Sequence, residues 1–170
     1  DGRLNLKMGG PGVYPEIPDE VLAGQSVPGK GWSKSPPEEA ARRSIYIHVK
    51  RSLLVPILEG FDIAETDRST PVRFNSTQPT QALGMLNGKF LNEEAVALAN
   101  RLKREAGPDR TAQIRLAMKL ATSREATEAD IKRGGQLVDS LVARDGYSPD
   151  RALAAFCLVV LNLNEVVYLD

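Results

Sequence analysis

The side chains best suited to chemistry gather in one central stretch of the chain, residues 42–87. This stretch contains the only histidine, several arginines and several carboxylates. Arginine forks bind carboxylate, sulfate or phosphate through paired hydrogen bonds, and a helix start beside them would add free backbone N–H groups. We therefore consider an anion site drawn from Arg43, His48, Arg51, Asp62, Arg73, Thr77, Gln81 and Asn87.

The same cluster has a structural interpretation, which the residue types favour. Its arginines would pair with the carboxylates of Asp62 or Asp67 and fix an irregular loop to its neighbour, because structural ion-pair networks produce such clusters. His48 has no cysteine and no second histidine at ligand spacing, so we expect no metal site.

The sequence carries none of the motifs that identify a common catalytic or cofactor site. It lacks H-E-x-x-H, C-x-x-C, C-x-x-C-H and G-x-S-x-G, and the segment Gly9-Gly10-Pro11-Gly12 does not match a phosphate-binding loop. The single cysteine excludes an internal disulfide. We therefore lean towards a chain that is not an enzyme and that holds no cofactor of its own.

Composition limits the class of protein further. The 170 residues suffice for one domain with a hydrophobic core. Lys+Arg and Asp+Glu both number 22, so there is no electrostatic reason to expect nucleic-acid binding. No apolar run reaches the length that spans a bilayer, so membrane insertion is not expected. The chain begins at Asp1 without Met, which indicates a processed product or part of a longer protein.

Proline and glycine divide the chain into two parts. Residues 1–35 are interrupted so often by these residues that we expect a long irregular arm. Residues 36–170 should form a single, mainly helical domain. Within it, residues 44–50 alternate between apolar and polar side chains, with Ile45, Ile47 and Val49 on one side, which predicts a strand with one buried face. A second short strand over residues 72–75 would complete a small hairpin.

Periodic apolar residues and cap signals predict the helices. We expect helices over residues 36–42, 79–87, 92–105, 109–123 and 127–143, and a last helix opened by Ser148-Pro149. Asn92 should cap the third of these, and Asn87-Gly88 should end the second in a left-handed turn. The last helix is apolar nearly all round, so it should lie at the centre of a C-terminal bundle. The pair Gly134-Gly135 interrupts its helix for a reason that the sequence leaves open.

Four segments carry a resemblance to a known family. RRSIYIHVKRSL, LEGFD, RFNSTQPTQALGMLN and LVVLNLNEVVYLD resemble, in this order, motifs of the C-terminal domain of unknown function in large planctomycete proteins. In that family the domain commonly accompanies a planctomycete cytochrome-c-like domain. The resemblance extends from about Met8 to Asp170 and implies that the chain is the back portion of the family's domain.

The resemblance implies a setting rather than an activity. It suggests a larger exported protein, an extracytoplasmic location, and a haem only in a separate domain. Our leading hypothesis is a non-catalytic interaction or scaffold module whose partner is the missing N-terminal part of the same protein. The first alternative is a binding or hydrolytic site for an acidic or sulfated glycan on the arginine cluster. The second is a module that docks a haem-bearing electron-transfer domain.

Overall fold

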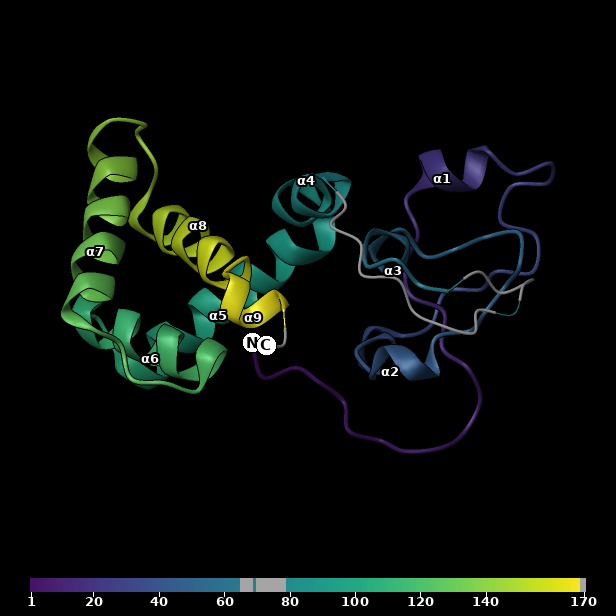
Figure 1. Ribbon diagram of the computed structural model, residues 1–170, viewed down its shortest axis with the longest axis horizontal. Coiled ribbons are helices and arrows are strands. Elements are labelled where there is room, and N and C mark those ends of the chain that lie inside the picture. The colour runs from purple at the N-terminus through teal and green to yellow at the C-terminus, as the bar shows by residue number, and fades with distance from the viewer. Residues whose placement is uncertain (65–68, 70–78, 169–170) are drawn as a thin grey trace. The chain divides into compact units, whose positions relative to one another are not determined.

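The computed structural model describes residues 1–64, 69 and 79–168 (Figure 1). The chain divides into two compact units, which we describe separately. Residues 3–81 form the small unit, and residues 1–2 with 82–170 form the helical unit. The division falls inside one helix. The separation of residues 1–35 from a domain over 36–170 stays a prediction.

The described residues are mostly helical, as the sequence indicates, and they contain no sheet. None of their helices has the length and apolarity needed to cross a membrane. The elements are α1 (Asp19–Ala23), α2 (Pro37–Ala40), the 3-10 helix η1 (Ser44–Tyr46), α3 (Pro56–Gly60), α4 (Pro79–Asn87), α5 (Lys89–Ala106), α6 (Arg110–Thr122), α7 (Glu128–Ala143), α8 (Pro149–Leu161) and α9 (Asn164–Val167).

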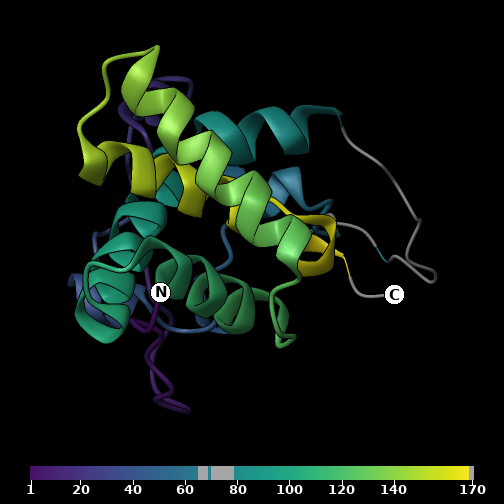
Figure 2. The ribbon, with the colours of Figure 1, turned by 90° about the vertical axis from the view of Figure 1, so that its left-hand side faces the viewer.

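Helix α8 lies at the centre of the helical unit, as its apolar composition predicts. It packs against α5, α6 and α7, and α7 crosses in front of it in Figure 2. Its inward face buries Ala152, Leu153, Phe156, Cys157 and Val160. Burial of apolar surface is the main favourable term in folding, so this contact holds the helical unit together.

Three helix starts in this unit follow their cap residues as predicted. The Asp109 carboxylate accepts from the backbone N–H of Thr111, and the Ser148 hydroxyl accepts from that of Arg151. Thr127 and Asp130 form a reciprocal capping box at the start of α7. Each cap satisfies a backbone donor that has no partner inside its own helix.

Gly134 allows α7 to approach its neighbours closely, which answers the question that the glycine pair raised. A Cβ at this position would lie 2.8 Å from Cε2 of Phe156 and 3.2 Å from Cδ1 of Ile114. A Cβ on Gly135 would meet no atom within 4 Å. Only the first glycine is therefore required by packing.

The junction of α4 and α5 differs from the prediction. Helix α5 begins at Lys89, three residues before Asn92, and the Asn92 amide donates to the carbonyls of Leu86 and Gly88 instead of capping. Gly88 has φ −67°, so the predicted left-handed stop is wrong. A Cβ at Gly88 would lie 2.4 Å from the Gly84 carbonyl oxygen, so a close approach explains this glycine.

The small unit has a core of its own around Ile17, Leu53 and Val55. The arm supplies part of it and contains the short helix α1. The arm also pairs with later residues through two isolated parallel bridges, Asn5 with Arg42 and Val13 with Ile47.

The strand predicted over residues 44–50 is wrong. Residues 44–46 form η1, and only Ile47 and Lys50 take part in isolated bridges. Ile45 and Val49 are 84% and 58% exposed, so the alternation does not mark a buried face. A strand needs a neighbour along its length, and the arm offers backbone partners only at Val13. The predicted second strand, residues 72–75, lies outside the described residues.

Candidate functional site

Arg42 is the most enclosed charged side chain that the structure describes in the central stretch. Its side chain is completely buried. The guanidinium donates hydrogen bonds to the backbone carbonyls of Lys7, Gly9 and Pro11 in the arm. It also lies over the Tyr46 ring, 4.0 Å from its centroid. A buried charge requires such partners, and these bonds fix the arm to the rest of the small unit.

An ion pair between Lys7 of the arm and Glu39 of α2 lies beside the Arg42 side chain. Glu39 lies 3.7 Å from the Arg42 guanidinium and 2.8 Å from the Lys7 ammonium. The hydrogen bond from Lys7 lowers the pKa of the Glu39 carboxyl below its ordinary value, with a smaller contribution from Arg42. Because Arg42 uses its donors on the protein itself, it serves as a structural anchor.

His48 belongs to a cluster of rings. Its ring centroid lies 4.7 Å from that of Tyr14 and 6.2 Å from that of Trp32, and the Tyr14 and Trp32 rings meet edge to face at 5.3 Å. The Trp32 indole donates to the Pro15 carbonyl. The histidine thus packs as an aromatic side chain. The described part of the chain holds no group of three His, Cys, Asp or Glu side chains arranged for a metal ion.

Arg43 and Arg51 both have exposed side chains. Within the described ranges, neither forms an ion pair or side-chain hydrogen bond. The arginine with a structural role in this part of the chain is Arg42 instead. Residue type alone does not distinguish Arg42 from Arg43. Which of two adjacent arginines is buried depends on the backbone of the arm, more than 30 residues away.

The other predicted residues are spread over different elements. Asp62 is exposed after α3 with φ +54°, and Gln81 is buried in the first turn of α4. The Asn87 amide donates to the Leu83 carbonyl at the end of α4. Arg73 and Thr77 lie outside the described residues. The anion site on the central cluster therefore stays a prediction.

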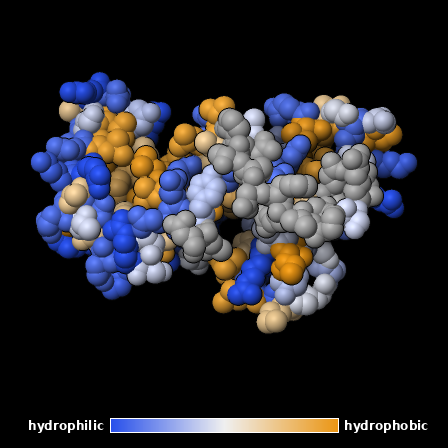
Figure 3. Space-filling view, in the orientation of Figure 1, coloured by the Kyte–Doolittle hydropathy of each residue, from blue (hydrophilic) through white to orange (hydrophobic). Residues whose placement is uncertain are grey.

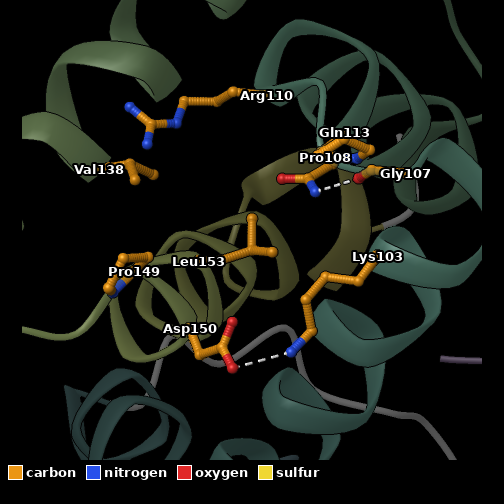
Figure 4. A pocket seen from close by; sticks show the side chains of 9 residues that line it. All are labelled: Lys103, Gly107, Pro108, Arg110, Gln113, Val138, Pro149, Asp150 and Leu153. Atoms are coloured by element: carbon orange, nitrogen blue, oxygen red, sulfur yellow. Dashed lines mark hydrogen bonds and ion pairs between the residues drawn. The ribbon is translucent and has the colours of Figure 1, made fainter.

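A separate pocket of about 440 Å³ opens in the helical unit (Figure 4). It lies where α5, α6, α7 and α8 meet. Its lining combines two cations, one carboxylate, one amide and apolar groups: Lys103, Gly107, Pro108, Arg110, Gln113, Val138, Pro149, Asp150 and Leu153. No local motif in the sequence indicates this pocket, because its lining joins residues from four helices.

Gln113 gives the pocket a fixed polar wall. The residue is buried, and its amide nitrogen donates to the Gly107 carbonyl at 2.6 Å. Since a carbonyl can only accept, this contact sets the orientation of the amide. The Gln113 oxygen is thereby turned away from Gly107 and towards the cavity, as Figure 4 shows.

The charged side chains of the pocket are paired at its rim. Lys103 lies 3.1 Å from Asp150, and Arg110 pairs with Asp139. All four side chains are substantially exposed. Exposed pairs of this kind contribute little to stability because water and salt screen them. Both cations are therefore available to exchange their partner for a ligand group.

Comparison with known families decides where the chain belongs. The family PSD1, described as a protein of unknown function (DUF1553), matches residues 1–138. The chain belongs to the PSD1 family. PSD1 domains occur with planctomycete cytochrome-c-like domains. No curated protein and no solved structure matches the chain.

The PSD1 match ends at Val138, before the closing segment LVVLNLNEVVYLD and before the pocket residues of α8. That segment is nevertheless tied to the matched part. The Arg124 guanidinium binds both carboxylate oxygens of Glu165, at 2.7 and 3.1 Å, and Asp130 at 2.8 Å. The Arg124 hydrogen bond is the largest of the causes that lower the pKa of both carboxyls. We call Arg124, Asp130 and Glu165 the C-terminal clasp.

Proposed function

We propose that this PSD1 chain is a non-catalytic interaction module that binds another part of a larger exported protein. The observation that carries the proposal is a set of exposed apolar side chains at the junction of α4 and α5. Leu83, Leu86 and Phe90 are 62%, 45% and 54% exposed. We call these three residues the α4 surface.

Large apolar side chains of this kind are costly to leave in water. Leu83 and Leu86 lie three residues apart on α4, which places them on adjacent turns of one side, while Met85 is buried. Phe90 follows in the first turn of α5. In Figure 3, hydrophobic side chains reach the surface of the helical unit among hydrophilic ones. Concentrated exposed apolar groups are typical of protein interaction sites.

Two side chains with potential catalytic chemistry are engaged in packing. His48 stacks on Tyr14 and Trp32. The Cys157 thiol is buried in α8, and burial raises its pKa to about 12, so the reactive thiolate is scarce at neutral pH. These placements support a non-catalytic role.

The partner we propose is the cytochrome-c-like domain that occurs with PSD1 domains. In this proposal the partner holds the haem, and both domains work outside the cytoplasm. The α4 surface would supply the apolar centre of the contact, as buried aromatic and aliphatic side chains do in stable interfaces.

Calorimetric titration of the chain with the cytochrome-c-like domain tests the proposal. We expect saturable binding, and we expect Leu83→Ser combined with Leu86→Ser and Phe90→Ser to weaken it by about tenfold or more. The control combines Leu120→Ser and Val159→Ser, two other exposed apolar positions of the helical unit. The control should bind like the unchanged chain. An absence of binding, or equal loss in both variants, would contradict the proposal.

A further inference from the structure

We propose that the pocket among α5, α6, α7 and α8 binds a small polyhydroxylated carboxylate, such as a hexuronic acid. This site is separate from the α4 surface, and its argument does not depend on the proposed interaction. It follows from the charge of the cavity lining, its hydrogen-bonding groups and its aliphatic wall.

The charge of the lining favours an anion. Lys103 and Arg110 contribute two positive charges, and Asp150 contributes one negative charge. Asp139, the partner of Arg110, does not line the cavity. A ligand carboxylate can therefore replace Asp139 on the planar Arg110 fork, which binds carboxylates through two parallel hydrogen bonds. The exchange costs little because the exposed pair is weak.

The remaining polar groups require hydroxyls as well as a carboxylate. The oxygen of Gln113 faces the cavity, and Asp150 adds a second acceptor beside the Lys103 ammonium (Figure 4). A simple fatty acid would leave the Gln113 oxygen without a donor. Hydroxyl groups can donate to Gln113 and Asp150 while they accept from Lys103.

The apolar residues and the volume fit a sugar ring. Val138 and Leu153 give the cavity an aliphatic wall that the C–H face of a pyranose can cover. The volume of about 440 Å³ falls in the range of about 300–1,000 Å³ that small-ligand pockets occupy. A single hexuronate is thus a suitable occupant.

Titration of the full chain with D-glucuronate, followed by amide NMR, tests the proposal. We expect saturable shifts centred on Gly107, Gln113 and Leu153. Glucose lacks the carboxylate and hexanoate lacks the hydroxyls, so each should bind at least about tenfold more weakly. No saturation below about 10 mM glucuronate, or equal binding of the three probes, would overturn the proposal.

Two matched arginine variants on α6 assign the binding to the pocket. Arg110→Gln removes the carboxylate fork and should weaken glucuronate binding by about tenfold. Arg115→Gln is the control, since Arg115 lies on the same helix in an exposed pair with Glu128 at 3.0 Å. It should leave binding within about twofold, because it lies outside the lining. Equal loss in both variants would show a general charge effect and overturn the site.

Discussion

Arg42 is the side chain on which the attachment of the arm depends, because one guanidinium satisfies the backbone carbonyls of Lys7, Gly9 and Pro11. Its replacement leaves these part-buried carbonyls without their donors, and that loss is more costly than the net value of a hydrogen bond. Adjacent Arg43 is exposed and does not donate to these carbonyls. The comparison between the two arginines isolates the effect of burial.

Arg42→Met keeps an unbranched, flexible side chain and removes every donor. We expect it to lower the unfolding free energy of the small unit by about 3 kcal/mol, whereas Arg43→Met should change it by less than about 0.5 kcal/mol. Trp32, the only tryptophan, reports on this unit in urea unfolding followed by fluorescence. Equal effects of the two substitutions would show that Arg42 does not hold the arm.

At the scale of elements, the contact between α7 and its neighbours depends on the missing side chain of Gly134. Alanine would improve the helix propensity by about 1 kcal/mol, but its Cβ would press on Phe156 and Ile114. Forcing extra volume into a packed core typically costs about 1–3 kcal/mol. The adjacent Gly135 gives a control without this contact.

We expect Gly134→Ala to destabilise the helical unit by up to about 2 kcal/mol and Gly135→Ala to stabilise it by up to about 1 kcal/mol. Urea unfolding followed by far-ultraviolet circular dichroism measures both. If Gly134→Ala were stabilising as well, the close approach would not limit the helix.

The sequence predicted elements well where the determining contacts are local. Asp109, Thr127 and Ser148 cap helices because their partners lie two or three residues away. The prediction was wrong where residues distant in the sequence determine the local structure. The alternation after Ser44 resembles a strand, but the arm supplies only one paired position there. Asn92 is a residue type that often caps helices, yet its side-chain amide donates to the preceding Gly88 carbonyl.

At the scale of the whole molecule, acid should weaken the fold because several carboxyls have lowered pKa values. The Arg124 hydrogen bond lowers those of Asp130 and Glu165, and the Lys119 hydrogen bond lowers that of Glu125. A carboxyl with a lowered folded-state pKa stabilises the protein above its ordinary value, here 3.8 for Asp and 4.5 for Glu. That contribution is lost as the pH falls through the lowered value.

Asp130→Ala tests this pH dependence. The variant loses the capping box and one ion pair of the C-terminal clasp, so its unfolding free energy at pH 7 should fall by about 1 kcal/mol or more. It should also fall less steeply than that of the unchanged chain below about pH 4. Asp139→Ala, an exposed position on the same helix, should keep the steep loss. Urea titrations from pH 7 to about pH 2 provide the measurement, and parallel curves for all three proteins would contradict the assignment.

The mostly helical class followed from composition and periodicity, but the division into two units did not. It arises because Ile17 and Trp32 of the arm join Leu53 and Val55 in a core apart from that around α8. The pocket was missed for the same reason, since Lys103, Gln113 and Asp150 come from three helices. The predicted anion cluster depends partly on Arg73 and Thr77, which lie outside the described residues.

The way Arg42 holds the arm has an evolutionary consequence. The guanidinium recognises carbonyl oxygens, which every amino acid possesses, and not the side chains of residues 7, 9 and 11. Substitutions along this segment that keep the path of the backbone would leave the hydrogen bonds from Arg42 intact. The part of the attachment that Arg42 provides therefore tolerates changes of side chain at these positions but not the loss of the arginine.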